Sequence, residues 1–522
     1  MTDRRLRVLA GTAGVGAEIA ARLDGASIRL SLGPDSTFER QVLIICLADL
    51  LGRLFPRLDV VVADDTCHPD LPPGPDSLSG RVAEARANGG LAPLKVGHDA
   101  IEVAIGAVAS ATSDLYVDAA GWQTYLGGSP SKLPDTNGDG DQLLAVGAVA
   151  AAARAAARIT DAVLLAAPSE QRQVLGTTDS TYASCLSYRT DSEPIEEPAP
   201  ALGAIDSVLI GAGSVGGASA YVFARTPQLA GSLVVVDPQI LEPTNLDRAL
   251  LATAALADQG AAKVKVVEQA LVHLTALQVV AFQGDITAYH ASLPREGVLP
   301  LVLTAVDSAD ARRAIQDCLP LRVLNAACHP HEVMVSGHST SDGPCLCCLH
   351  MPELMNGDAT KAKLIAAKTG FPLMAVVQLL TQQVLLTEHH LRGIEANNHM
   401  PIGALNSYLG HTLDELWRGQ LLYGATQVET EGGAQVAVAA PYVTALAGTL
   451  LAGEALKAAS AKPSAGLGPA GPAIKYTENP VAGPAFGQMS NPERWEGSEC
   501  LCRSTRRLRI LRLRYGLPEV TF

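Results

Sequence analysis

The sequence predicts an α/β protein with two domains, the second built on a mainly parallel sheet that helices cover on both faces. Apolar, β-branched runs alternate with helical stretches between residues 205 and 324, and glycines join the first run to the helix that follows. A weaker version of this alternation lies at the start of the chain. With 522 residues, of which 48% are hydrophobic, the chain can bury two such cores without disulfides.

The charge balance argues against a nucleic acid or an anionic membrane as partner. The formal net charge is -14 at pH 7, whereas both of these partners need clustered positive charge. The N-terminal segment lacks the sustained apolar core of a secretory signal, so we expect a cytoplasmic protein. Residues 434–453 are uncharged but include Pro441 and two glycines, which favours a buried helix over a membrane span.

A linker is expected where the chain reads TDSEPIEEPAPALGA, from Thr190 onward. Its Pro and Glu content and its lack of apolar periodicity predict a linker over 191–204. The expected domains are then 1–190, an α/β N-terminal domain, and 205–522.

The first domain resembles a faint copy of the second. Its expected order is a strand at Ser27–Leu32, a helix at Phe38–Phe55 and a strand at Leu58–Val62, and an Ala-rich helix at 143–159 matches in character the helix at 434–457. These similarities favour an inactive, degenerate duplication. The alternative is that two unrelated α/β domains share this general plan.

A phosphate-binding turn is predicted at Gly211, Gly213 and Gly216. They form GxGxxG directly after an apolar strand and directly before a helix. In that context the first glycine permits a tight turn, the second allows backbone to approach a phosphate, and the third lets helix and strand pack closely. Asp237 ends the next strand, where a carboxylate can hold ribose hydroxyls. These four residues do not distinguish an NAD site from an ATP site.

The following segment favours ATP. Asn245 and Arg248 lie in NLDR, and Lys263 follows Asp258, Gln259 and Gly260. Cations above the glycine turn suit a triphosphate, whose charge must be neutralised before its α-phosphorus accepts a nucleophile. Asp307 follows the apolar strand VLPLVLTAV, at the edge where ligands of such sheets bind, and can hold Mg²⁺. An NAD-dependent oxidoreductase would leave this cluster without a role.

The sequence resembles the ThiF/MoeB/ubiquitin-activating-enzyme superfamily of E1-like adenylyltransferases. The matching segments, in family order, are GAGSVGGASA, VVVDPQILEPTNLDRALL, ADQGAAKVKV, TAVDSADARRAI, LNAA, GPCLCCL and APYVTALAGTLLAGEALK. The resemblance implies a Rossmann-like adenylation fold that works as a homodimer or an intrachain pseudo-dimer.

The resemblance also implies roles for the site residues. Gly211, Gly213 and Gly216 would shape the ATP loop and Asp237 would bind ribose. Asn245, Arg248 and Lys263 would contact phosphates, and Asp307 would serve Mg²⁺ and catalysis.

Two features depart from the family pattern. Gln239 stands where many members have a second acid, and the arginine-rich helix that lends an arginine to a neighbouring site is not recognisable. Arg189, or the pair Arg4 and Arg5, are the substitutes that the sequence offers for that arginine.

A zinc site is predicted from two cysteine pairs. Cys345 and Cys348 form CxxC, and Cys500 and Cys502 form CxC near the C-terminus. Four thiolates suit tetrahedral Zn²⁺, which would pin the C-terminal segment to the sheet domain. Cys347 is the cysteine of this segment that is not expected to bind the metal. The alternative to a zinc site is that the four cysteines are buried and reduced without a metal.

No thioester cysteine is expected in the crossover region, because residues 350–499 contain no cysteine. The remaining candidates are Cys347 and Cys328. Neighbouring histidines could lower the pKa of Cys328; the alternative is an ordinary buried cysteine at the end of a strand. An insertion at about 351–433 is the expected substrate-facing cover. At the C-terminus, RSTRRLRILRLRY predicts an edge strand with a basic face.

The expected function is ATP-dependent adenylation of the C-terminal carboxylate of a ubiquitin-like protein or small peptide. Arg248, Lys263 and Asp307 are the expected catalytic residues, with ATP, Mg²⁺ and Zn²⁺ as cofactors. The alternatives are a non-catalytic nucleotide-binding adaptor of the same fold and an adenylyltransferase that tailors ribosomal peptides.

Overall fold

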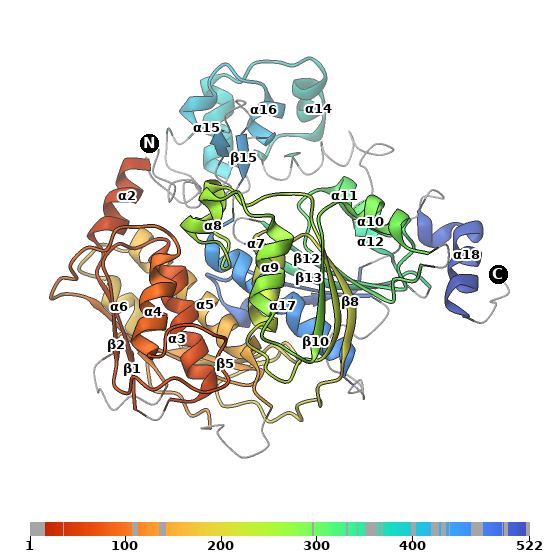
Figure 1. Cartoon of the computed structure of the whole chain (residues 1–522). Coiled ribbons are helices and arrows are strands. Elements are labelled where there is room, and N and C mark those ends of the chain that lie inside the picture. Colours follow the sequence, from red (N-terminus) through yellow and green to blue (C-terminus); the bar gives the residue numbers. More distant parts are fainter. Residues whose placement is uncertain are drawn as a thin grey trace.

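The fold is known from a computed structural model (Figure 1). It describes residues 16–34, 36–106, 113–134, 142–294, 297–329, 332–341, 343–349, 362, 365, 366, 369–397, 403, 405–418, 427–429, 435–437, 439–460, 473–492, 494 and 500–517. Arg4 and Arg5, and much of the expected insertion, lie outside these residues.

The first sheet has seven strands in the order β2-β1-β3-β4-β5-β6-β7. The strands β2, β1, β3 and β4 are parallel, and β5, β6 and β7 each run antiparallel to the neighbour before them. Their bounds are β1 Ile28–Leu32, β2 Leu58–Val62, β3 Ile101–Ile105, β4 Leu115–Ala120, β5 Gln123–Gly127, β6 Thr181–Ser184 and β7 Thr190–Asp191. The helices of this half are α2 Gly16–Gly25, α3 Phe38–Gly52, α4 Leu78–Ala87, α5 Ala145–Leu165 and α6 Gln171–Gly176.

The second sheet has eight strands in the order β10-β9-β8-β11-β12-β13-β16-β17. Five of them, β10 to β12 in that order, are parallel, and the last three are antiparallel. Their bounds are β8 Ile205–Ile210, β9 Gly231–Val236, β10 Leu277–Phe282, β11 Leu301–Thr304, β12 Arg322–His329, β13 Glu332–Ser339, β16 Ala473–Glu478 and β17 Gln488–Ser490.

Helices cover both faces of this second sheet, as predicted. On one face lie α7 Ser214–Phe223, α9 Lys263–Leu271 and α17 Pro441–Ala459. The other face carries α10 Ile286–Ser292, α11 Ala309–Asp317 and α12 Leu346–Leu349, whose apolar side chains join those of β8 and β11 in a separate core. The mainly parallel α/β class expected from the sequence is therefore confirmed.

The two halves repeat one topology. Strands β9-β8-β11-β12-β13-β16-β17 match β2-β1-β3-β4-β5-β6-β7 in order and in parallel or antiparallel sense. A helix connects the first two strands along the chain in each half: α3 in the first half and α7 in the second. A long helix precedes the last two strands of each half: α5 in the first and α17 in the second. This repeat supports a degenerate duplication, which stays a proposal.

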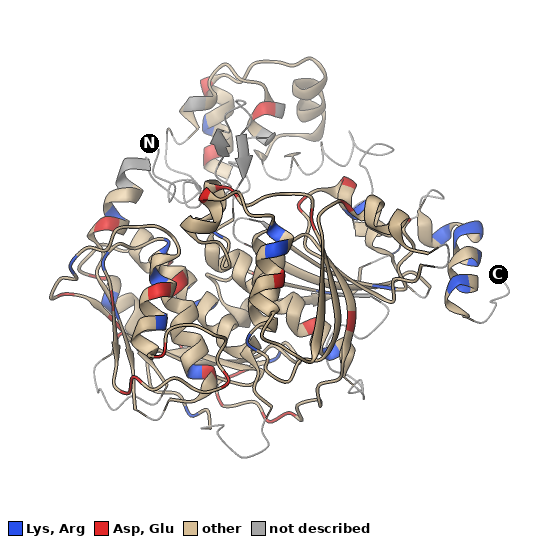
Figure 2. Cartoon of the chain, in the orientation of Figure 1, with Lys and Arg blue, Asp and Glu red and all other residues tan. Residues whose placement is uncertain are grey.

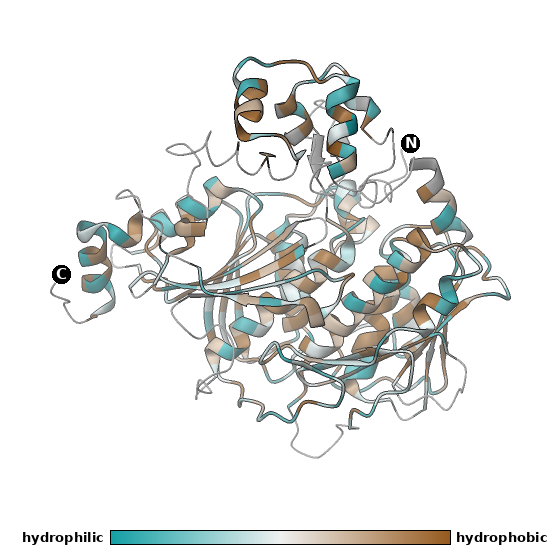
Figure 3. Cartoon of the chain, turned by 180° about the vertical axis from the view of Figure 1, so that it is seen from behind, coloured by the Kyte–Doolittle hydropathy of each residue, from teal (hydrophilic) through white to brown (hydrophobic). Residues whose placement is uncertain are grey.

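A shared helical layer joins the halves. Helix α5 packs on α3 within its own half and on α17 of the other, and α17 packs on α7. Their side chains form one continuous hydrophobic cluster from β1 to α17. Figures 1 and 3 show this arrangement, with two sheets outside and largely apolar helices between them. Of the expected linker, 191–204, Asp191 ends strand β7 and residues 192–204 contain no helix or strand. The two domains that it connects nevertheless share a core.

The expected insertion contains a small core of its own. Helices α14 Leu373–Thr381, α15 Glu388–Asn397 and α16 Leu413–Arg418 surround it, with a short turn, η3 Asn406–Tyr408. In Figure 1 this unit lies on the same side of the molecule as α8 Ala254–Asp258. The remaining short elements are β14 Gln427–Glu429, β15 Gln435–Ala437, η1 Pro243–Asn245, η5 Pro484–Phe486 and η6 Leu501–Arg503.

The edge strand predicted at the C-terminus is wrong, because this segment forms helix α18, Thr505–Tyr515. Ser504 caps its first turn by accepting from the Arg507 amide, and Leu508 and Leu511 are buried at helical spacing. Gly516 ends it in the left-handed region. Lys and Arg colouring gathers along α18 in Figure 2.

Among the described residues, no helix is both long and apolar enough to cross a membrane. Within the segment 434–453, which the sequence assigned to a buried helix, Gln435–Ala437 form strand β15 and the buried helix α17 begins at Pro441.

A buried ion pair between the halves offers a test of their joint folding. Arg154 of α5 donates two hydrogen bonds to Glu478 of β16, at 2.8 and 2.7 Å, and both side chains are buried. Arg154→Ala would leave the carboxylate unpaired, so we expect it to lower the free energy of unfolding by about 3–5 kcal/mol. Urea denaturation of the full chain measures this difference.

Arg172→Ala is the matched control. Arg172 pairs with Asp114 at 2.9 Å, but its side chain is 46% exposed, so its loss should cost about 0–1 kcal/mol. Equal effects of the two substitutions would contradict a shared core held by Arg154.

Candidate functional site

The glycine turn has the geometry that its motif predicts. Strand β8 ends at Ile210, Gly211 follows with φ of +95°, and Gly213 caps α7. A Cβ on Gly216 would lie 1.8 Å from the Gly211 carbonyl oxygen, which no side chain tolerates. The turn therefore needs glycine at 211 for its backbone angle and at 216 for the approach of helix to strand.

Asp237 is bound to this turn. It follows β9 and is 6% exposed. One carboxylate oxygen accepts from the Ala212 amide at 2.7 Å, and the other accepts from the Gln239 amide at 2.8 Å. The acid predicted to hold ribose is thus fixed beside the predicted phosphate turn.

Lys263 begins α9 and is 8% exposed. Its Nζ donates to Gln239 Oε1 at 2.7 Å, so the residue that replaces the family's second acid holds the lysine. Burial lowers the pKa of Lys263, and the positive charge of Arg248 lowers it further. The negative charges of Asp237 and Asp307 raise it in part. Lys263 therefore lies within electrostatic range of the three other charged residues predicted for the site.

Arg248 and Asn245 lie on a structured loop between β9 and α8. Asn245 Oδ1 accepts from the Glu242 amide at 3.0 Å and so caps the turn η1. Arg248 donates to the Thr244 carbonyl and to Asp247, both at 2.9 Å, and remains partly exposed. Arg248 therefore forms an ion pair with its neighbour Asp247.

Asp307 lies exposed beyond the end of β11, and Arg312 supports its loop. Arg312 is buried on α11 and donates to the carbonyls of Val306 and Asp307. Sequence reasoning missed this residue. The available signal was an arginine five positions after Asp307, on the face of the helix that packs on the sheet.

The site residues come together at the carboxyl ends of β8, β9 and β11, the edge at which parallel sheets bind ligands. The sequence model of the ThiF family matches residues 196–482, more than half of the chain. The chain belongs to the ThiF family. The resemblance to E1-like adenylyltransferases is thereby confirmed.

Similarity to individual proteins is weaker. The chain is 26% identical over 493 residues to the uncharacterised protein y4jF of Sinorhizobium fredii, covering 92% of this chain and 89% of that one. Solved structures of E. coli MccB match with TM-scores near 0.3. The complex with ATP has a TM-score of 0.31, 13% identity and coverage of 57% of this chain and 67% of that chain. The complex with succinimide has a TM-score of 0.32 and 13% identity, and the match covers 57% of this chain and 66% of MccB. This chain therefore spans slightly less than two thirds of that protein. The structure of PaaA has a TM-score of 0.30 and 13% identity, and the match covers 56% of this chain and 65% of PaaA.

The first half of this ThiF-family chain lacks an equivalent turn. Helix α3 has Arg40 at its third position, where α7 has Gly216. Arg40 forms a buried bidentate pair with Asp118 of β4, at 2.9 and 3.0 Å, and a Cβ on Gly106 would lie 2.6 Å from its Nε. The third position of the helix therefore carries a buried, paired side chain in the first half and glycine in the second.

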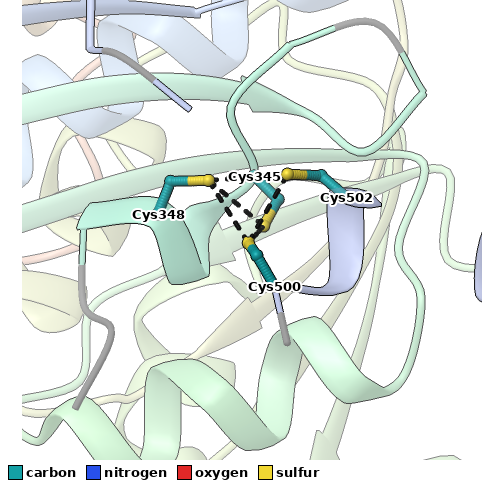
Figure 4. A group of neighbouring side chains, drawn as sticks. All are labelled: Cys345, Cys348, Cys500 and Cys502. Atoms are coloured by element: carbon teal, nitrogen blue, oxygen red, sulfur yellow. Dashed lines mark hydrogen bonds between the residues drawn. The ribbon is translucent and has the colours of Figure 1, made fainter. Parts of the chain in front are cut away.

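Four cysteine sulfurs form one cluster, as predicted (Figure 4). The sulfurs belong to Cys345, Cys348, Cys500 and Cys502. Sulfurs in contact are 3.4 to 3.9 Å apart, and all four lie within 4.8 Å of one another. Tetrahedral zinc with Zn–S bonds of about 2.3 Å requires sulfur separations of about 3.8 Å. The four residues therefore fit a closed metal site, and CxC serves as well as CxxC.

The two other cysteines that the sequence singled out, Cys328 and Cys347, lie outside the four-sulfur cluster. Burial raises the pKa of the Cys328 thiol to about 11, so the lowering by histidines that the sequence suggested is wrong; His331 lies outside the described residues. Cys347 is buried beside the metal cluster.

A chain of buried polar groups connects the Asp307 loop with the cysteine turn. Arg312 Nε donates to Asn325 Oδ1 at 3.1 Å, and Asn325 Nδ2 donates to Ser336 Oγ at 3.3 Å. His338 contacts Ser336 at 2.9 Å and the Pro344 carbonyl at 3.2 Å. Burial lowers the pKa of His338 to about 4, so the neutral ring donates to Pro344 and accepts from Ser336.

The cysteine cluster predicts that the purified chain holds about one zinc per molecule. Cys500→Ser should reduce the zinc content to a small fraction of that and lower the melting temperature, because α18 loses its attachment. Elemental analysis and thermal denaturation measure both effects.

Cys347→Ser is the control, since this neighbouring cysteine is outside the four-sulfur group. It should keep the metal. Equal zinc loss in both variants, or a wild-type chain purified from zinc-containing medium without metal, would contradict this assignment.

Proposed function

We propose that the chain is an ATP-dependent adenylyltransferase that activates the C-terminal carboxylate of a ubiquitin-like protein or a small peptide. One observation carries the proposal: a glycine turn, a buried acid, two cations and an exposed acid meet at a single sheet edge in a ThiF-family fold. The residues are Gly211, Asp237, Lys263, Arg248 and Asp307.

The reaction is a substitution at the α-phosphorus of ATP. A carboxylate oxygen of the substrate attacks the α-phosphorus while the bond from this phosphorus to the bridging oxygen breaks. The products are an acyl-adenylate and pyrophosphate, so charge accumulates on the leaving group. Lys263 and Arg248 supply positive charge beside the turn, and Asp237 holds the ribose.

Lys263 suits this role because it is already desolvated. Its lowered pKa shows that burial penalises its charge, and an incoming triphosphate would offset that penalty by strong Coulomb attraction. Arg248 would exchange its bond to Asp247 for phosphate oxygens. Asp307, together with phosphate oxygens, would hold Mg²⁺, which when bound would neutralise part of the phosphate charge.

Activation without a covalent thioester fits the cysteine chemistry. Residues 350–499 contain no cysteine, and the pKa of Cys328 is raised by burial. A thiol nucleophile acts as the thiolate, which Cys328 does not readily form. The acyl-adenylate would then pass directly to an external nucleophile, a chemistry open to both ubiquitin-like and peptide substrates, including ribosomal peptides that are tailored.

A non-catalytic nucleotide-binding adaptor is the second candidate, favoured by Gln239. Lys263 is held there by a neutral amide instead of a carboxylate. Tight ATP binding without pyrophosphate exchange, tested with a panel of peptide carboxylates, would support this candidate over the first.

Asp307→Ala should abolish ATP–pyrophosphate exchange, with a fall of about 10²-fold or more, because charge on the leaving pyrophosphate loses its metal support. Asp310→Ala is the matched control, as Asp310 is an exposed acid on the adjoining helix, three residues away. Exchange that survives Asp307→Ala unchanged would refute the assigned role.

The chain should bind one ATP, not two. Helix α3 of the first half carries Arg40 where α7 carries Gly216, and Arg40 is already bound to Asp118, so we expect the turn at Gly211 to be the one that binds ATP. Isothermal titration with ATP and Mg²⁺ should give a stoichiometry near one, and Gly216→Ala should eliminate binding. A stoichiometry near two would contradict the inactive first half.

A further inference from the structure

A buried arginine of the first half reaches the nucleotide-site loop of the second. Arg53, at the end of α3, is 2% exposed. Its guanidinium donates to the carbonyl oxygen of Leu246, to that of Ala252 at 3.3 Å and to that of Leu250 at 3.5 Å. These three residues flank Arg248, the cation assigned to phosphate. The contact joins positions almost 200 residues apart in the chain.

The same loop is held from another side by α17. Thr444 Oγ1 donates to the Arg248 carbonyl at 3.0 Å. Alternate carbonyls of the loop, at 246, 248, 250 and 252, therefore all accept side-chain hydrogen bonds from outside it. Such a set of bonds determines the path of the backbone that carries Arg248.

Arg53 is oriented by its own neighbours. Its Nε donates to Asp49 Oδ1 at 2.6 Å, and Asn88 donates to the other oxygen of Asp49 at 2.7 Å. A Cβ on Gly89 would lie 2.8 Å from both Cα and Cγ of Arg53. The charge is neutralised by Asp49, and the remaining donors point to the loop. A planar fork with several donors suits this position, whereas a lysine could satisfy only part of it.

We propose that Arg53 is a positioning residue, through which the first half holds the Arg248 loop in the shape that binds the triphosphate. This inference rests on the proposed function of the Gly211 site. The inactive half then has a defined role in nucleotide binding. Arg53 itself would not contact the nucleotide; its guanidinium would organise the backbone that carries Arg248, which would.

General adhesion between the halves does not account for the placement. Two other bonds between the halves lie away from the Arg248 loop: Tyr188 Oη donates to Glu454, in the later part of α17, at 2.6 Å, and Arg154 pairs with Glu478 of β16. Glu454 is ten residues beyond Thr444, or about 15 Å along the helix. Two buried arginines of the first half, Arg53 and Arg154, form hydrogen bonds to the second half within the described residues. Of these two, Arg53 donates to the loop around Arg248, whereas Arg154 donates to Glu478.

The test measures ATP affinity of the full chain by isothermal titration for wild type, Arg53→Lys and Tyr188→Phe. We expect Arg53→Lys to weaken ATP binding about tenfold, because the loop is no longer held at three carbonyls. Tyr188→Phe removes a partly buried hydrogen bond between the halves and should leave ATP affinity within about twofold of wild type. Melting temperatures of both variants monitor stability separately.

A double-mutant cycle with Arg248→Ala separates positioning from a structural effect. If Arg53 acts through Arg248, adding Arg53→Lys to Arg248→Ala should weaken ATP binding little further. Fully additive losses, or wild-type affinity in Arg53→Lys, would overturn the proposal. A wild-type chain that binds no ATP would instead refute the proposed function itself.

A second variant covers the case in which Arg53→Lys does not fold. Arg53→Met combined with Asp49→Leu replaces the buried pair by apolar side chains of similar volume, an exchange that is often neutral for stability. It also removes every bond from Arg53 to the loop. The folded double variant should lose ATP affinity at least as strongly as Arg53→Lys, and unchanged affinity would overturn the proposal.

Discussion

The burial of α17 is the constraint on which the rest of the structure depends. Every residue of this helix from Pro441 to Lys457 is buried, so it has no face for solvent and needs partners all round. It packs on α7, on α5 of the first half, and against β12. A helix of this kind cannot be completed by either half alone, which explains why a chain with a recognisable linker has one continuous core.

The same helix sets the nucleotide turn. A Cβ on Gly448 would lie 2.3 Å from the Val215 carbonyl, and Ser219 donates to the Gly448 carbonyl at 2.8 Å. Helix α7 is thus held against α17 at backbone distance, and α7 begins at the glycine turn. Thr444, one turn earlier, bonds the Arg248 carbonyl. The glycine turn and the loop that carries Arg248 are therefore both positioned by one buried helix, and Arg53 holds that loop from the other half.

Charge is distributed differently in the two halves. In the first, Arg40 and Asp118 neutralise each other inside the protein. In the second, Lys263 is held by a neutral amide, and Asp307 stands exposed. An ion pair that is already satisfied offers little to a ligand, whereas a desolvated lysine near an exposed carboxylate gains from one. Repeated topology thus supports a structural role in one half and a binding site in the other.

The sequence by itself determined the parallel α/β class, the glycine turn, Asp237 and the four clustered cysteines, because each depends on local spacing or on the chemistry of a few residue types. The edge strand expected at the C-terminus failed because alternation of Arg and Leu cannot be separated from helical spacing without knowing which leucines are buried. Only the tertiary structure revealed Arg53, Arg312 and the shared helical layer. These depend on contacts between segments far apart in the chain, and no local pattern in the sequence records which carbonyl a buried guanidinium will meet.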